Sequence, residues 1–183
     1  MLRVVRSDSE IEMRLATVLF FLTVIPLANA EVRHSTAAGF ESHHRLILAT
    51  TPERAYAALV DDVGLWWDAT HSYGGDAAGF SIDDSAGGCF CEKGDGLAVE
   101  HMRVVNAKPG HYLVMRGGLG PLQGMAVTGS MRFEFKPHAQ GTELIYSYRV
   151  GGYYPGGLTA LADPVDQVQL GQLLRLQKHI AER

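Results

Sequence analysis

The sequence lacks the patterns that mark several large classes of protein. It has no heptad runs and no internal repeats of about 20–50 residues, which excludes coiled coils and solenoids. It has no long lysine and arginine cluster, and its net charge is −4, so we expect no nucleic-acid partner. The motifs Gly-x-Ser-x-Gly, His-Glu-x-x-His and Gly-x-x-x-x-Gly-Lys are also missing. We therefore expect no serine-hydrolase, zinc-protease or phosphate-loop chemistry, and no cofactor.

Cysteine is scarce, with only Cys89 and Cys91 present. In an extended strand, residues two apart have Cα atoms about 6.5–7 Å apart, at or beyond the usual disulfide range. A bridge therefore requires the strand to bend. Thiolates and imidazoles bind zinc or copper, so the pair could form a metal site with His101 or His71. No ligand-spacing signature supports such a site, and two small buried side chains on one strand face are the favoured interpretation.

The sequence also has no apolar run long enough to span a membrane. Its longest apolar run is short and lies near the N-terminus. Arg3, Arg6 and Arg14 precede an apolar stretch over residues 15–27, and small residues follow at positions 28 and 30. About thirteen apolar residues cannot span a bilayer core of about 30 Å as a helix. The pattern is typical of a secretory signal peptide that is cleaved after the first thirty residues. We expect a periplasmic or secreted protein with no membrane span after cleavage; the alternative is an uncleaved anchor.

What is present is a globular composition, with 46% hydrophobic and 20% charged residues in 183. Residues 31–39 are small and polar and suggest a flexible lead. Residues 40–50 alternate as a strand does, and about six further strands separated by glycine turns follow between residues 80 and 150. Short turns between consecutive strands predict an antiparallel meander. Residues 117–124 are rich in glycine, and we interpret them as a turn or a flexible lip.

Two short helices and one long helix accompany these strands. Thr51 is a good N-cap before Pro52, and a second short helix holds residues 65–67. Asp163 and Pro164 open the long C-terminal helix in the same way. Its stripe at helical spacing contains Val165, Val168, Gln172, Leu173, Leu176 and Ile180. The order of elements predicts an α+β fold, with this stripe packed on the concave face of the sheet.

Five short stretches resemble a known superfamily in the correct order. They are residues 51–59 (TPERAYAAL), 65–67 (LWW), 87–92 (GGCFCE), 109–113 (PGHYL) and 141–144 (GTEL). They are similar to the START-like or SRPBCC superfamily, which includes polyketide cyclases, plant pollen-allergen-type lipid binders and activators of a chaperone ATPase. These five stretches are most similar to the chaperone-activator-like branch of the superfamily. Those activators work in the cytosol, so the export signal means that their activity is not implied here.

The resemblance implies a helix-grip fold over residues 40–183. An antiparallel sheet of about six to seven strands would wrap around the C-terminal helix, with two short helices after the first strand. A ligand cavity would lie between sheet and helix, and such cavities are mostly apolar with a few polar groups. The candidate ligand-binding residues are Trp66, Trp67, Tyr73, Phe133, Tyr146, Tyr148, Gln172 and Leu176. For the aliphatic ones we favour simple core packing; for the Trp and Tyr residues both roles stay open.

Residues 100–103 hold three ionisable groups. Alternation places His101 and Arg103 on one side of the strand and Glu100 on the other. Facing the cavity, His101 could act as a general acid or base and Arg103 as an anion clamp. Facing outward, they would be solvated surface groups, which we slightly favour.

Three functions follow from the sequence. The first is binding of a small hydrophobic or amphipathic molecule in the helix-grip cavity. The second is a cyclase- or hydrolase-type enzyme that uses polar groups of that cavity. The third is a ligand-free interaction module, for which the sequence identifies no protein partner.

Overall fold

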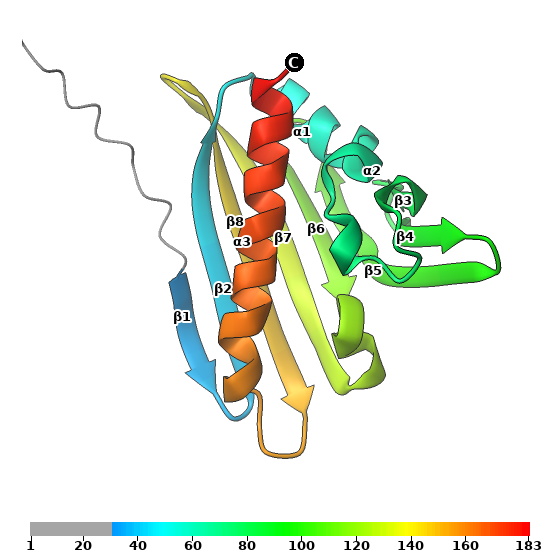
Figure 1. The fold of residues 1–183 in the computed structure, drawn as a ribbon. Helices are drawn as coiled ribbons and strands as arrows, with labels where there is room; N and C mark the ends of the chain where they lie inside the picture. The colour runs from blue at the N-terminus through cyan, green and yellow to red at the C-terminus, as the bar shows by residue number, and fades with distance from the viewer. Residues whose placement is uncertain (1–30) are drawn as a thin grey trace, which may run out of the picture.

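A single antiparallel sheet and one long helix dominate the computed structural model, which describes residues 31–183. The strands are β1 (Glu31–Thr36), β2 (Gly39–Leu48), β3 (Phe80–Ile82), β4 (Cys89–Gly94), β5 (Leu97–Lys108), β6 (Tyr112–Gly117), β7 (Ala126–His138) and β8 (Gly141–Tyr153). The helices are α1 (Pro52–Asp61), α2 (Val63–Trp66) and α3 (Thr159–Ala181), with 3-10 turns η1 (Ala69–His71), η2 (Ala77–Gly79) and η3 (Gly120–Gly124). The sheet order is β1-β2-β8-β7-β6-β5-β4-β3, and every pairing is antiparallel (Figure 1).

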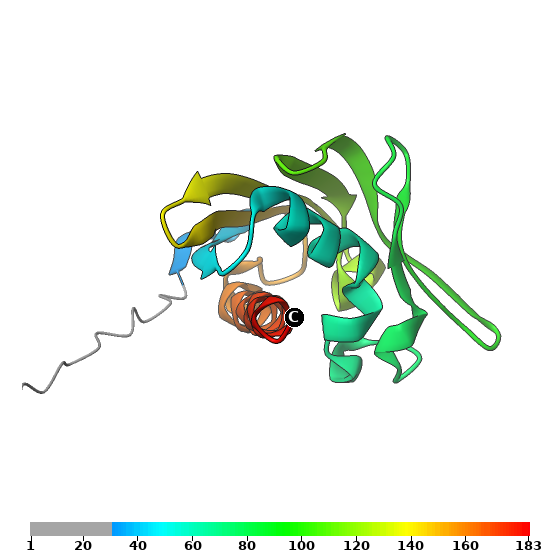
Figure 2. The same ribbon diagram turned by 90° about the horizontal axis from the view of Figure 1, so that it is seen from above.

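The sheet curves around α3, as the view from above shows (Figure 2). This helix packs mainly against β2 and β1, at one end of the sheet. The segment from α1 to η2 lies on the same side of the sheet, next to α3 (Figures 1 and 2). A cavity lies between α3 and this segment, against His101 of β5 and Tyr148 of β8.

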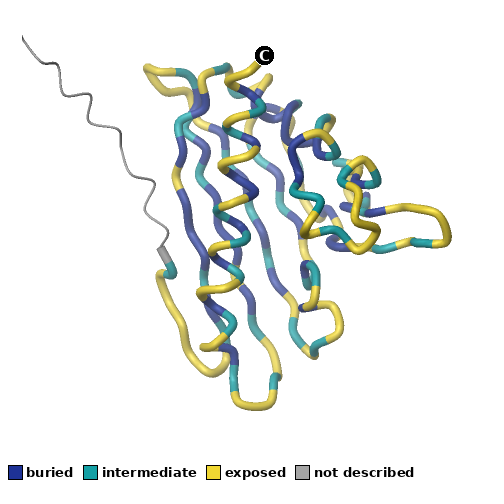
Figure 3. Tube along the Cα trace, in the orientation of Figure 1, coloured by how far each residue is buried: buried dark blue, intermediate teal, exposed yellow. Residues whose placement is uncertain are grey.

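The alternation of the long strands agrees with the sequence. Met131, Phe133 and Phe135 of β7 are buried, and so are Tyr146 and Tyr148 of β8. Along α3, Figure 3 shows buried positions recurring at helical spacing between exposed ones, so that one face of the helix is buried against the sheet. Burial of these side chains is the main stabilising contribution of the fold, because each removes a large apolar surface from water.

Three expectations about elements need correction. Residues 31–36 form strand β1, paired with β2, where a flexible lead was expected. The sheet therefore has eight strands, slightly more than six to seven. Helix α3 begins at Thr159, before the expected cap, and Pro164 lies inside it. Pro164 removes only the hydrogen bond to the carbonyl of Ala160, which is exposed near the helix start, so the helix tolerates it.

The helix α1 begins as expected. Thr51 accepts a hydrogen bond from the backbone N–H of Arg54 (3.4 Å), and Pro52 opens the first turn. The expected signal peptide lies outside the described residues. No helix between residues 31 and 183 is both long and apolar enough to cross a membrane.

Candidate functional site

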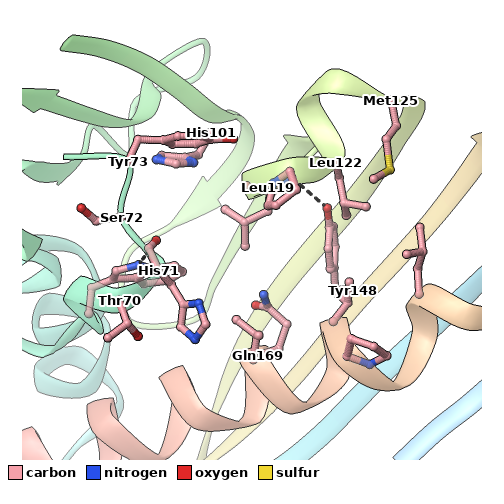
Figure 4. A pocket seen from close by; sticks show the side chains of 17 residues that line it. Thr70, His71, Ser72, Tyr73, His101, Leu119, Leu122, Met125, Tyr148 and Gln169 are labelled. Carbon is pink, nitrogen blue, oxygen red and sulfur yellow. Dashed lines mark hydrogen bonds between the residues drawn. The ribbon is translucent and has the colours of Figure 1, made fainter. Parts of the chain in front are cut away.

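A cavity of about 400 Å³ opens between α3, the 3-10 turns η1 and η3, and the inner face of β5 and β8. Most of the side chains around it are apolar or aromatic, with a few polar groups between them. It is lined by Trp67, Thr70, His71, Ser72, Tyr73, His101, Leu119, Gly120, Pro121, Leu122, Met125, Tyr148, Leu161, Pro164, Val165, Val168 and Gln169. Figure 4 shows Tyr73 and His101 at one end and Leu122, Met125 and Tyr148 at the other.

The structure divides the expected ligand-binding residues into two groups. Trp67, Tyr73 and Tyr148 line the cavity. The others are core residues: Trp66, Phe133, Tyr146 and Gln172 surround a void of only about 10 Å³, and Leu176 is fully buried. Leu173 belongs to this core group too, whereas Val168 lines the cavity. Strand and helix periodicity identifies the inward face but not which part of that face stays open.

His101 reaches the cavity because β5 bulges at that residue. Cys91 pairs with Glu100 and Phe90 pairs with Met102, so His101 has no partner of its own on β4. An extra residue in one strand breaks the alternation. His101 and Met102, although adjacent, are therefore both buried, with exposed fractions of 3% and 1%.

The same bulge separates His101 from Arg103, which corrects the expectation that they share a face. Arg103 lies outside the cavity with its side chain about half exposed. It donates to the carboxylate of Glu100 and to the carbonyl oxygen of Gly87 (2.8 Å). Arg103 is thus a surface ion-pair residue and cannot clamp an anion in the cavity.

The ring of His101 is held by a carboxylate at Nε2 and by two stacked aromatic rings. Its Nε2 lies 3.1 Å from Oε2 of Glu92, a side chain that is 1% exposed. Glu92 also accepts hydrogen bonds from the backbone N–H groups of Tyr73 (3.1 Å) and Gly74 (2.6 Å). The rings of Phe80 and Tyr73 stack with the imidazole, at centroid distances of 5.1 and 5.9 Å. The imidazole is therefore fixed in position before any ligand arrives.

The pKa values of this pair favour a neutral histidine and an ionised carboxylate. Burial lowers the pKa of His101 below its ordinary value, and the nearby Glu92 only partly offsets this. Burial works against ionisation of Glu92, but the N–H groups of Gly74 and Tyr73, together with His101, outweigh it. The pKa of Glu92 is consequently lowered.

Tyr148 connects the glycine-rich lip to the sheet. Its hydroxyl accepts a hydrogen bond from the backbone N–H of Leu119 (3.2 Å) and donates to the carbonyl oxygen of Gly117 (3.3 Å; Figure 4 shows the first). Burial raises the pKa of Tyr148 to about 12, with the Leu119 N–H acting in the opposite direction. The tyrosine is therefore a neutral tether that holds the lip over the cavity.

Cys89 and Cys91 form a disulfide with a Cα–Cα distance of 5.3 Å. That distance is shorter than two steps along an extended strand, so the backbone of β4 bends between the two cysteines. The expectation of two unbridged buried side chains is therefore wrong. The candidate metal site with His101 or His71 is not supported either, since both sulfurs are bonded to each other. No cluster of potential metal ligands occurs within residues 31–183.

Sequence reasoning missed a buried cluster of Ser42, His44 and Asp166. Nε2 of His44 lies 2.9 Å from Oδ1 of Asp166 and 3.2 Å from Oγ of Ser42, which also donates to that carboxylate oxygen. A catalytic triad needs the acid on one imidazole nitrogen and the serine on the other. Here both face Nε2, and none of the three residues lines the cavity. The cluster joins β2 to α3 rather than forming a hydrolase site.

The lip and helix residues of the cavity were also missed as ligand contacts. Leu119 and Leu122 come from the glycine-rich segment, Met125 directly follows it, and Leu161 and Val165 come from the first turns of α3. The available signal was the glycine-rich segment itself, which the sequence suggested as a lip. Residue periodicity carries no information about how far α3 lies from β5.

Solved structures with the same architecture exist, although the sequence matches no family profile and no curated protein. An uncharacterized protein from Rhizobium leguminosarum superposes with a TM-score of 0.57 at 16% identity, covering 86% of this chain and 99% of its own. Ara h 8.0201 gives 0.54 at 12% identity, covering 79% and 99%. DynU16, a protein of the dynemicin biosynthetic locus, gives 0.54 at 15% identity, covering 77% and 47%.

These similarities establish the fold. The chain has the helix-grip fold that these solved structures share. At such low sequence identity, structural similarity shows a shared fold but not a shared activity.

Proposed function

We propose that this protein is exported and binds a small, largely apolar molecule in the cavity beneath the lip. The observation that carries the proposal is the cavity itself, whose volume of about 400 Å³ falls within the range of small-molecule sites, about 300–1,000 Å³. A ligand-free interaction module gives no reason for a recess of this kind, because contiguous exposed apolar surface usually marks a binding site.

Export is supported by one feature of the sequence and one of the structure. The first thirty residues have the pattern of a cleaved signal peptide. The Cys89–Cys91 disulfide fits an oxidising compartment, since disulfides persist outside the cytosol. The proposed location is therefore the periplasm or the extracellular space.

A cyclase- or hydrolase-type activity has less support. Arg103 lies outside the cavity, and the buried cluster of Ser42, His44 and Asp166 lacks both access and triad geometry. Of the expected catalytic groups, only His101 lines the cavity. Binding is thus the function that the geometry supports best.

A cavity-filling substitution tests the proposal. Val168 lines the cavity from α3, so Val168→Trp should place an indole in the ligand's space. We expect the uncharged probe 2-methoxynaphthalene to bind the natural protein and to lose at least tenfold in affinity in this variant, as measured by fluorescence titration. Leu174→Trp is the matched control, because Leu174 is on the same helix, 41% exposed and away from the cavity.

The control should bind the probe like the natural protein. Absence of binding to the natural protein, or equal binding to both tryptophan variants, would contradict the proposal.

A further inference from the structure

The polar groups around the cavity differ in whether they are already engaged. Gln169 accepts a hydrogen bond from the hydroxyl of Tyr146 (2.7 Å), and Tyr148 is bonded to the lip. Ser72 accepts from the backbone N–H of Asp76 (3.0 Å). His101 is different, because its Nδ1 is buried and has no hydrogen-bond partner among residues 31–183. A buried polar atom without a partner is uncommon and calls for an explanation.

The hydrogen bonds of Glu92 decide what this nitrogen can do. An ionised carboxylate only accepts, so the Nε2 of His101 that faces it must carry the proton. In a neutral imidazole the other nitrogen is then an acceptor with a free lone pair. The lowered pKa values of both residues are consistent with this protonation state. Nδ1 of His101 is therefore an unpaired hydrogen-bond acceptor, covered by its neighbours, on a side chain that lines the Tyr73 end of a mostly apolar cavity.

We propose that the natural ligand is an apolar ring or chain compound with a hydroxyl group, and that His101 selects it by accepting the hydroxyl's hydrogen bond on Nδ1. The inference rests on the proposed function and adds the chemical class of the ligand. A carboxylate has no proton to donate and would face the lone pair of Nδ1, so fatty acids are disfavoured. An ether or a hydrocarbon of the same shape fits the cavity but leaves Nδ1 without a partner, a loss comparable to an unsatisfied buried acceptor.

A matched set of probes separates the hydroxyl from the apolar body. We expect 2-naphthol to bind at pH 8 about tenfold more tightly than 2-methoxynaphthalene, with 2-naphthoate the weakest, because a buried hydrogen bond contributes about that factor. In His101→Phe, which retains an aromatic ring that can stack with Tyr73 and Phe80, 2-naphthol and the ether should bind equally. His138→Phe, in the exposed β7–β8 hairpin, is the control and should keep the tenfold preference.

The protonation state gives a second readout that does not depend on a variant that folds. In ¹⁵N NMR of the natural protein, the ring of His101 should be protonated at Nε2, and the Nδ1 resonance should shift when 2-naphthol is added but not with the ether. Protonation at Nδ1, equal affinity for the two probes, or a preference that survives in His101→Phe would overturn the inference and leave the proposed function standing. Failure of every probe to bind would overturn both.

Discussion

At the scale of single residues, His101 and Glu92 form the most specific feature of the cavity. His101 is buried against aromatic rings, and Glu92 is buried beneath two backbone N–H donors. The sequence placed His101 among the candidates but attached it to Arg103, because alternation was extended through a bulge that no residue pattern marks. The residue type thus predicted what His101 can do chemically, whereas the face of the strand on which its side chain lies was not predictable.

The pair makes folding sensitive to acid. The pKa of His101 is lowered from 6.5, so below that pH the unfolded chain binds a proton that the folded protein resists. The stabilisation is fully present above pH 6.5 and is lost as the pH falls toward the folded value. The lowered pKa of Glu92 acts with the same sign below pH 4.5.

We therefore expect the free energy of unfolding, measured by urea titration, to decrease between pH 7 and pH 5. His101→Phe should flatten this part of the profile, whereas His138→Phe in the exposed hairpin should leave it in place. A stability that increases on acidification over this range, or an unchanged slope in His101→Phe, would be inconsistent with a buried neutral histidine.

At the scale of elements, the lip formed by residues 117–125 is a short segment held mainly by its ends. Tyr148 tethers Gly117 and Leu119, and the side chain of Gln123 donates to the carbonyl oxygen of Glu100 (2.8 Å). Gly117 has a φ of 154°, and a Cβ there would lie 2.7 Å from the carbonyl oxygen of His101. The close approach of the two backbones explains the glycine at the point where β6 enters the lip.

Removal of the tether should loosen the lip. In Tyr148→Phe the backbone groups of Leu119 and Gly117 lose their shared partner, which should lower the free energy of unfolding by about 1–2 kcal/mol. Hydrogen exchange at residues 118–124 should become faster than in the natural protein.

Tyr153→Phe is the control, since Tyr153 is on the same strand and 72% exposed. Equal exchange rates at residues 118–124 in both variants would show that the hydroxyl of Tyr148 does not hold the lip.

The strands and helices themselves were largely predictable. Thr51 and Pro52 identified the start of α1 correctly, because capping depends on neighbouring residues alone. The start of α3 was placed too late, since a proline is also tolerated inside a helix near its first turns. Strand β1 was missed because five of its six residues are polar and the segment is ordered by pairing with β2, which is a tertiary effect.

At the scale of the whole molecule, the helix-grip fold was predictable and the shape of its cavity was not. The order of elements and five short stretches of sequence led to the architecture that the solved structures share. The cavity depends on α3 packing mainly on β2 and β1, which leaves the inner face of β5 and β8 open at His101 and Tyr148, next to η3. The position of α3 at one end of the sheet explains why Trp67 and Tyr148 line the cavity while Trp66 and Tyr146 fill the core.

The most direct measurement is to locate the probe 2-methoxynaphthalene on the protein by methyl NMR. The account predicts intermolecular contacts with methyl groups of Leu119, Leu122, Met125, Leu161 and Val165, which come from the lip and from α3 on opposite sides of the cavity. Contacts confined to the surface groove around Arg54 and Ile180, or no contacts with the lip and α3 together, would contradict it.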